Sequence, residues 1–140
     1  MKDEISFVDT NILIYSMDID AGVKREKAVA LLDELWGKET GRISIQVLQE
    51  FYVNVCKKLK NKLSPKIASQ IINDYLVWQP YSIIGPDIIR AIELEQSFKV
   101  SFWDSLIVVA AQKLRATILW TEDLQNGFTF DNVTVKNPFT

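Results

Sequence analysis

The chain contains no histidine and only one cysteine, Cys56, among its 140 residues. Without histidine, Ser-His-Asp and Cys-His catalysis, imidazole general bases and histidine-ligated zinc sites are excluded. A single cysteine can form neither an internal disulfide nor a thiolate metal cluster, and it fits a reducing compartment. Any catalytic chemistry must therefore rest on carboxylates, with lysine, tyrosine or a bound cation as the remaining contributors.

Glycine is also scarce, and no apolar run approaches the roughly 18 residues that a membrane span requires. With five glycines and no glycine-rich loop, the chain has neither a P-loop nor a dinucleotide-binding fingerprint. The opening Met-Lys-Asp-Glu lacks the apolar core of a secretory signal, so we expect a cytoplasmic protein with no membrane partner. The length and the 48% hydrophobic content predict one globular domain over residues 1–140.

Strand-like and helix-like patterns alternate along the sequence. The predicted strands are residues 5–8, 42–44, 81–84, 116–121 and 133–135. The predicted helices are residues 10–15, 23–36, 45–59, 65–76, 85–98 and 102–111, with Gly37 or Gly41 ending the second and Ser44 capping the third. This alternation predicts an α/β fold in three layers, α/β/α, with a central parallel sheet covered on both faces.

Asp9 directly follows the apolar strand at residues 5–8. In open α/β sheets, ligands bind beyond the carboxyl ends of the strands, so an aspartate at this point suits a reactive group. The same position also suits a helix N-cap, because an aspartate oxygen accepts hydrogen bonds from the first free backbone N–H groups. The residue on its own leaves both interpretations open.

Three further acids occupy informative positions. Asp123 follows the strand at 116–121, so parallel strands would bring it to the same sheet edge as Asp9. Glu50 lies at the border of an apolar helix face, where it is either an ordinary boundary residue or able to reach that edge. Asp104 comes three residues after Ser101, as in a helix capping box. We expect Asp104 to need a long, bent approach along the sheet edge to join the other acids.

A lysine-rich segment without acids joins the third and fourth predicted helices. Its lysines are Lys57, Lys58, Lys60, Lys62 and Lys66. Lysines near a helix C-terminus are favoured by the helix dipole, so a solvated helix end is one interpretation. The other is a phosphate-attracting patch that offsets a net charge of −2.

The acids belong to four motifs that together resemble the acidic motifs of the PIN-domain nucleases. In order, these motifs are Phe7-Val8-Asp9-Thr10-Asn11, Gln46-Val47-Leu48-Gln49-Glu50-Phe51, Ser101-Phe102-Trp103-Asp104-Ser105-Leu106-Ile107 and Trp120-Thr121-Glu122-Asp123-Leu124-Gln125-Asn126-Gly127. Within that superfamily the chain is similar to the VapC-type toxins of bacterial toxin–antitoxin pairs. Asn137-Pro138-Phe139 also looks like the end of such chains.

The resemblance assigns roles to individual residues. It implies that Asp9, Asp104 and Asp123 ligate a metal ion and that Glu50 is a ligand or a water-orienting base. It also implies supporting polar roles for Thr10, Asn11 and Thr121, whereas Asp18 stays outside the site and Glu122 is a poorer candidate than Asp123. Oxygen ligands without histidine or cysteine favour Mg²⁺ or Mn²⁺, and such a cation relieves the repulsion among close carboxylates.

The function implied by the resemblance is that of a Mg²⁺- or Mn²⁺-dependent endoribonuclease, the toxin of a toxin–antitoxin pair. Its expected partners are RNA, steered by the lysine-rich segment, and a small antitoxin protein that inhibits it. A homodimer is also expected, with Trp36, Trp78 and Tyr81 as candidate contacts.

Two alternatives use the same residues differently. A non-catalytic PIN-like module could bind RNA or protein while its acids hold a structural ion. A phosphatase or receiver domain also places aspartate at strand ends, but a phosphatase of the HAD type needs Asp-x-Asp where this chain has Asp9-Thr10-Asn11. A receiver domain needs a paired acid beside the first strand and a lysine after a late one, so both fit poorly.

Overall fold

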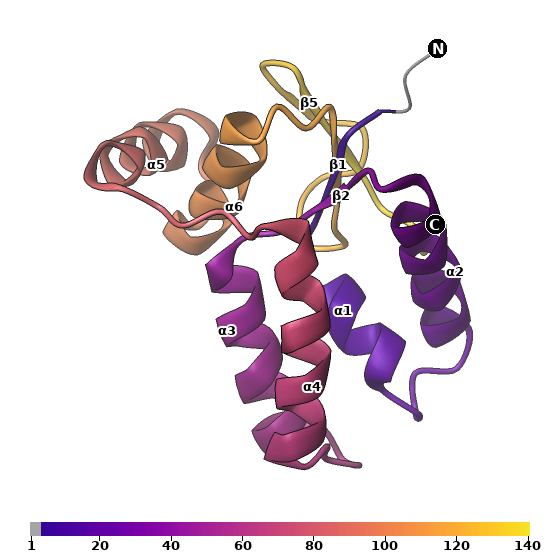
Figure 1. Ribbon diagram of the computed structural model, residues 1–140. Helices are drawn as coiled ribbons and strands as arrows, with labels where there is room; N and C mark the ends of the chain where they lie inside the picture. The colour runs from indigo at the N-terminus through magenta and orange to yellow at the C-terminus, as the bar shows by residue number, and fades with distance from the viewer. Residues whose placement is uncertain (1–3) are drawn as a thin grey trace.

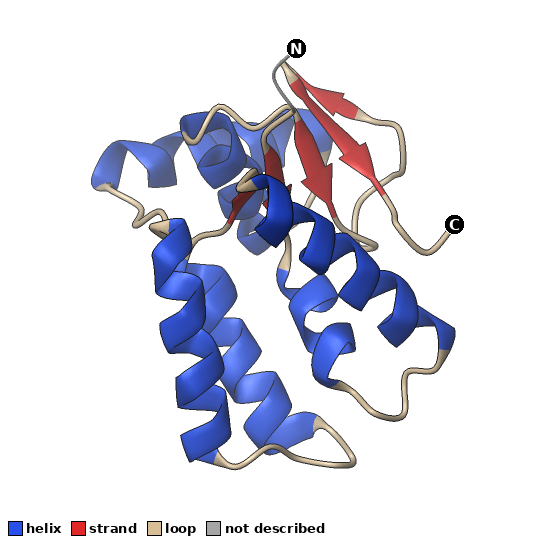
Figure 2. Cartoon of the chain, turned by 45° about the vertical axis from the view of Figure 1, so that its right-hand side comes forward, coloured by secondary structure: helices blue, strands red, loops and turns tan. Residues whose placement is uncertain are grey.

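The computed structural model describes residues 4–140, which form a central sheet flanked by helices (Figures 1 and 2). The strand order is β2-β1-β3-β5-β4. The strands are β1 (Ser6–Val8), β2 (Gly41–Arg42), β3 (Ile118–Trp120), β4 (Thr129–Phe130) and β5 (Val133–Lys136). All pair in parallel except β4, which pairs antiparallel with β5 at the edge. The predicted α/β fold with a central sheet flanked by helices is confirmed, although the sheet was expected to be parallel throughout and β4 is antiparallel.

The helices account for most of the remaining described chain. They are α1 (Thr10–Met17), α2 (Val23–Lys38), α3 (Ile45–Val53) with its π-helical extension η1 (Asn54–Lys58), α4 (Pro65–Tyr75) with the 3₁₀ turn η2 (Leu76–Trp78), α5 (Gly85–Phe98) and α6 (Phe102–Lys113). Helices α5 and α6 lie on one side of the sheet and α2 on the other (Figure 1). No described helix has the length and apolar character needed to cross a membrane.

Serine side chains start three of these helices. Ser44, Ser64 and Ser101 each accept a hydrogen bond from the backbone N–H three residues later. Such caps satisfy N–H groups that have no partner within the first helical turn. The N-cap predicted at Ser44 is therefore confirmed.

The sheet register brings the carboxyl ends of β1 and β3 to the same level. Val8 pairs with Trp120, and the Asp9 N–H donates to the Trp120 carbonyl at 3.0 Å. The residues after the two strands, Asp9 and Thr121, therefore emerge side by side at one edge. Behind them the sheet is closely packed, since Phe7, Val8 and Leu119 are all fully buried.

Helix α6 is buried almost all round, because residues 105–111 form an unbroken buried run. Their apolar character on every face is typical of a helix covered by other elements. Helix α5 packs extensively along α6. The two helices together place the first turn of α6 firmly against the rest of the domain.

The predicted strand at 81–84 is wrong. Tyr81 makes only an isolated parallel bridge with Ser44, and Ile83 and Ile84 are exposed. The apolar character of these isoleucines suggested a buried strand, but Ile84 is instead the N-cap residue directly before α5. The short edge strand β4 was not predicted, because its two residues are too few to show a period.

Three aromatic residues near α4 pack together. Trp78, which the sequence suggested as a dimer contact, is 8% exposed and packs with Trp36 and Tyr75, whereas Ile67 and Leu76 in the same part of the chain are both 48% exposed. Gly41 permits this arrangement, since a Cβ there would lie 2.3 Å from the Trp78 ring.

The second helix ends without glycine. Helix α2 runs through Gly37 to Lys38, and Glu39 takes the left-handed conformation at φ 58°. The predicted stop at Gly37 or Gly41 is wrong, because Gly37 lies inside α2 and Gly41 belongs to β2.

Candidate metal centre

Asp9, Asp104 and Asp123 meet at the carboxyl edge of the sheet. Each offers one carboxylate oxygen, and these three atoms lie within 4.8 Å of one another. Asp9 is buried, Asp104 is half-buried and Asp123 is exposed, so the cluster extends from the core to the surface. The grouping expected from the sequence is therefore present in the fold.

Asp9 both caps a helix and faces the other acids. Its Oδ1 accepts a hydrogen bond from the Thr10 N–H at 2.7 Å, and its Oδ2 accepts one from the Thr121 hydroxyl at 2.9 Å. Burial raises the pKa of Asp9 to about 7, and the charges of Asp123 and Asp104 add to the increase although the two hydrogen bonds oppose it. The capping and ligand interpretations are thus compatible.

Asp104 reaches the cluster from the first turn of α6. Its N–H donates to Ser101 Oγ at 3.0 Å, which fixes the start of the helix. Burial raises the pKa of its carboxyl group, and the charges of Asp123 and Glu50 also raise it against the lowering effect of Ser101.

The expected bent approach of Asp104 is wrong. Helix α6 precedes β3 and runs in the opposite direction, so it begins at the carboxyl edge of the sheet. Asp104 in its first turn lies beside Asp9, which follows β1, while Thr117 beyond its last turn donates to the carbonyl of Ile5 at the start of β1. An ordinary helix-to-strand connection therefore delivers Asp104 without distortion.

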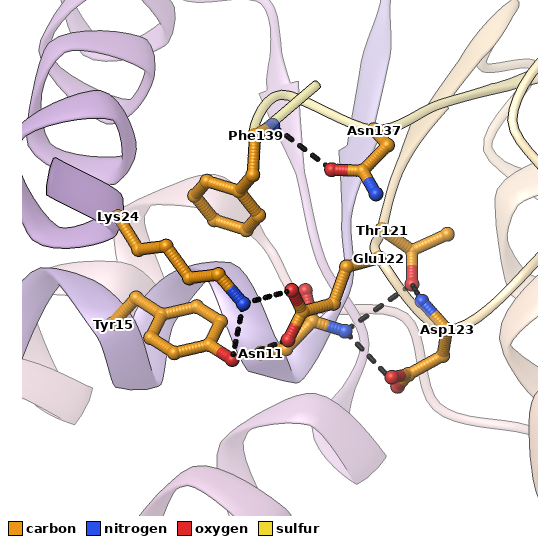
Figure 3. Close-up of polar contacts among 8 residues, drawn as sticks. All are labelled: Asn11, Tyr15, Lys24, Thr121, Glu122, Asp123, Asn137 and Phe139. Carbon is orange, nitrogen blue, oxygen red and sulfur yellow. Dashed lines mark hydrogen bonds and ion pairs between the residues drawn. The ribbon is translucent and has the colours of Figure 1, made fainter. Parts of the chain in front are cut away.

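Asp123 is held by the side chain of Asn11 and by its own loop (Figure 3). The Asn11 amide donates to Asp123 Oδ2 at 3.0 Å and to Thr121 Oγ1 at 3.2 Å. The Asp123 N–H donates to the same Thr121 oxygen at 3.0 Å. Thr121 thus connects Asn11 and Asp123 to Asp9, and both it and Asn11 lie at the site, as expected.

Glu50 lies beside the three aspartates but outside the 4.8 Å group. Its Oε1 accepts a hydrogen bond from the Thr10 hydroxyl at 2.7 Å. Because its charge contributes to the raised pKa of Asp104, the carboxylate is electrostatically part of the site. Its position suits a group that orients water or approaches a bound ion from the side.

The lysine-rich segment lies apart from the acids. Lys57, Lys58, Lys60, Lys62 and Lys66 are all exposed. They surround the turn between η1 and α4, at the end of the α3–α4 pair that points away from the sheet (Figure 1). The structure leaves these lysines open to solvent and does not bring them to the aspartates.

Glu122 points toward Tyr15 and Lys24, two residues that the sequence did not indicate (Figure 3). Its Oε1 accepts a hydrogen bond from the Tyr15 hydroxyl, and its Oε2 pairs with the Lys24 ammonium at 2.9 Å. Burial raises the pKa of Tyr15, and the bond to Glu122 raises it further. No local signal could have identified these partners, because they lie far from Glu122 in the sequence.

The residues present fit a hard divalent cation. Oxygens about 2.1 Å from an octahedral Mg²⁺ or Mn²⁺ lie roughly 3–4 Å from one another, close to the spacing of the three aspartates. The ligand set consists of oxygens alone, which these ions prefer. Burial is the main cause of the raised pKa of Asp9, but the charges of Asp123 and Asp104 also raise it, and a cation would relieve this repulsion.

Fold and site together define an α/β protein with an acidic, cation-type site at the carboxyl edge of a mainly parallel sheet. The family model for the PIN domain matches residues 6–133, so the chain belongs to the PIN domain family. No curated protein matches the chain.

Two solved structures resemble the fold over nearly its whole length. One is a toxin–antitoxin complex from Klebsiella pneumoniae, 24% identical, with a TM-score of 0.57 and coverage of 95% of this chain and 97% of that one. The other is VapBC2 from Rickettsia felis bound to a DNA fragment from its promoter, 20% identical, with a TM-score of 0.58 and coverage of 95% and 98%. At these identities the likeness establishes the fold alone.

Proposed function

We propose that this chain is a metal-dependent endoribonuclease and the toxin of a toxin–antitoxin pair, with residues 1–140 acting as one nuclease domain in the cytoplasm. The observation that carries the proposal is the group of three carboxylate oxygens within 4.8 Å in a member of the PIN domain family. The resemblance to a toxin–antitoxin complex and to VapBC2 supports the biological role.

Asp9, Asp104 and Asp123 would hold Mg²⁺ or Mn²⁺, directly or through water. The bound cation would supply charge stabilisation at the scissile phosphate and help to activate the attacking water. Thr121 keeps Asp9 oriented through a buried hydrogen bond, and Asn11 orients the exposed Asp123. The chain thereby fixes the direction of its ligands before the cation arrives.

Glu50 would orient the attacking water or accept its proton. The Thr10 hydroxyl holds Glu50 Oε1 at 2.7 Å, and Thr10 itself begins α1 directly after Asp9. This short connection keeps Glu50 at a fixed position relative to the buried ligand. Proton transfer from a water requires such placement at hydrogen-bond distance.

Cleavage of RNA in the presence of a divalent cation tests the function. The purified chain should cleave RNA in Mg²⁺ or Mn²⁺ but not in a chelator. Asp104→Asn should lower the cleavage rate by about 10²-fold or more. It removes a negative charge that would hold the cation, and the cation would stabilise the transition state.

Asp131→Asn is the matched control for Asp104→Asn. Asp131 is exposed and is bound by Arg90 and Gln112 outside the site, so its replacement should leave the cleavage rate unchanged. Equal cleavage by the Asp104→Asn variant and the parent would contradict the assignment. Thermal stabilisation by Mn²⁺ without any hydrolysis would instead indicate a non-catalytic module with a structural ion.

The exposed lysines between η1 and α4 are proposed to steer the RNA backbone. Replacing Lys57, Lys60 and Lys62 with glutamine should flatten the salt dependence of RNA binding, because fewer counterions are displaced from phosphate. Fluorescence anisotropy at several salt concentrations measures the slope. A slope equal to that of the parent would show that these side chains form an ordinary solvated helix end.

The remaining proposed partners are a small inhibitory antitoxin and a second copy of the chain. Trp78 is removed from the candidate dimer contacts because it is buried, whereas Trp36 and Tyr81 are half-buried.

Several exposed isoleucines lie on or beside α5: Ile83, Ile84, Ile88, Ile89 and Ile92. Sedimentation of the purified chain over a range of concentrations distinguishes a monomer from a dimer.

A further inference from the structure

A second polar cluster adjoins the aspartates and joins three separate segments (Figure 3). Glu122, in the loop after β3, binds the Tyr15 hydroxyl of α1 and the Lys24 ammonium of α2, the latter at 2.9 Å. Lys24 Nζ also lies 3.4 Å from the Tyr15 hydroxyl. These three residues, here called the Glu122 clamp, fasten the loop to both helices.

Phe139 packs against the clamp (Figure 3). Its ring meets that of Tyr15 edge to face, with centroids 5.1 Å apart, and Lys24 Nζ lies 5.6 Å from its centroid. Edge-to-face rings and a cation near a ring face are both favourable arrangements. Asn137, which binds the Phe139 N–H, also donates its own N–H to Asn126 in the loop. The loop is therefore fastened near both ends.

The clamp acts on the residue next to a proposed metal ligand. Asn11 and Tyr15 are four residues apart on α1, which places them on the same helix face. Asn11 binds Asp123, and Tyr15 binds Glu122, so successive turns of one helix hold successive residues of the loop. Asp123 is exposed and gains little support from packing. Its position therefore depends on how the loop is held.

We propose that the Glu122 clamp positions Asp123 for cation binding and that Glu122 is a positioning residue rather than a ligand. The inference rests on the proposed cation site. Residues that orient a metal ligand through hydrogen bonds typically change metal affinity by about 10- to 100-fold when they are replaced. An exposed ion pair with no such role contributes little beyond modest stability.

Mn²⁺ binding to the full chain, measured by isothermal titration calorimetry, tests the inference. Glu122→Gln should weaken Mn²⁺ binding by about 10-fold, and Tyr15→Phe should weaken it less, because Lys24 still holds Glu122. Glu34→Gln is the matched control, since it removes an exposed 2.8 Å pair with Lys38 from α2 far along the helix from Lys24. This control should bind Mn²⁺ as the parent does.

Hydrogen exchange in the loop supplies a second measurement that needs no metal. The Asp123 N–H, bound to Thr121, should exchange faster in Glu122→Gln and Tyr15→Phe than in the parent, while the N–H groups of α6 should not change. If Glu122→Gln does not fold, Tyr15→Phe keeps the aromatic packing and allows both measurements. Unchanged Mn²⁺ affinity in a folded variant would overturn the positioning role.

The results separate this inference from the proposed function. A parent chain that binds Mn²⁺ but cleaves no RNA, with weaker Mn²⁺ binding in Glu122→Gln, would support the clamp and contradict the nuclease. A parent that cleaves RNA, with Mn²⁺ affinity unchanged in Glu122→Gln, would support the nuclease and contradict the clamp. A parent that binds no Mn²⁺ would overturn the cation site and the clamp's role together.

Discussion

Two aspartates with little exposed surface, Asp9 and Asp87, lie in opposite electrostatic surroundings. They are 4% and 0% exposed. Asp87 Oδ2 accepts hydrogen bonds from the Tyr81 hydroxyl and the Ile84 N–H, and Lys113 Nζ lies 3.7 Å from Oδ1. Burial alone would raise the pKa of Asp87, but these bonds and the lysine charge outweigh it and lower the pKa. The surroundings of Asp87 thus stabilise its ionised carboxylate.

Asp9 also accepts two hydrogen bonds, but the charged groups close to it are carboxylates. Burial raises its pKa to about 7, and the negative charges of Asp123 and Asp104 add to this increase. Low exposure of a carboxylate therefore does not by itself set the direction of its pKa shift. Asp9 differs from Asp87 in its stronger desolvation and in having carboxylates, not a lysine, as its charged neighbours.

The structural role of Asp87 follows from what it connects. Tyr81 exchanges backbone hydrogen bonds with Ile43 and Ile45, at the start of α3, and its hydroxyl binds Asp87 in the first turn of α5. Burial and this carboxylate together raise the pKa of Tyr81 to about 12. Asp87 therefore fastens α5 to the chain that begins α3.

The largest expected effect is on catalysis, in Asp9→Asn. Asparagine keeps an oxygen for the Thr10 N–H but loses the charge, so RNA cleavage should fall by about 10²-fold or more while the fold remains. Cleavage rates in Mg²⁺ and thermal unfolding in a chelator check the two parts. A variant that cleaves at the parent's rate would remove the distinction between Asp9 and Asp87.

The next effect is a pH dependence of stability in the absence of divalent cations. Asp9 has a pKa of about 7 when folded, against an ordinary 3.8, so the folded chain binds a proton more tightly than the unfolded chain. Its contribution to the free energy of unfolding should therefore fall by about 4 kcal/mol at most as the pH rises from about 4 to 7.

The lowered pKa of Asp87 makes stability depend on pH in the opposite direction. Its contribution to stability is present above pH 3.8 and is lost as the pH falls through the lower, folded-state pKa.

Urea unfolding at several pH values, for the parent and Asp9→Asn, isolates the contribution of Asp9 to the pH dependence of stability. Equal pH slopes for the two proteins would contradict it, and saturating Mn²⁺ should remove the slope from the parent alone.

The smallest expected effect is on stability, in Asp87→Asn. Loss of the charge weakens the bonds to Tyr81 and Ile84, which should lower the free energy of unfolding by about 2 kcal/mol. RNA cleavage by the folded variant should stay within a factor of about two, because Asp87 lies outside the proposed metal site. Urea unfolding at pH 7 and cleavage assays check both. Loss of cleavage with unchanged stability would reverse the roles assigned to the two aspartates.

Much of this comparison could not be drawn from the sequence. The strand-to-aspartate pattern and the ordered motifs predicted that Asp9, Asp104 and Asp123 would meet, and the structure brings them within 4.8 Å. Asp87 lies in the predicted helix at residues 85–98, and nothing in the sequence singled it out. Its burial depends on Tyr81 and Lys113, which come from different segments that no local pattern pairs.

The errors and omissions share a physical cause. Ile83 and Ile84 were predicted in a strand because they are apolar, and Trp78 was named as a candidate dimer contact although it is buried. In both cases exposure depends on which segments pack together. The partners of Glu122 in α1 and α2 were missed for the same reason. Local periodicity predicts helices and strands, whereas contacts between distant segments are set by the sheet order.

The position of β3 beside β1 links assembly of the three-aspartate group to the progress of chain synthesis. Asp9 emerges from the ribosome early, but it meets Asp123 only after β3 has been added alongside β1. A nascent chain that stops before β3 therefore lacks Asp123 and cannot form the group of three carboxylates, however well its helices have formed. The group assembles only when almost all of the chain has been translated.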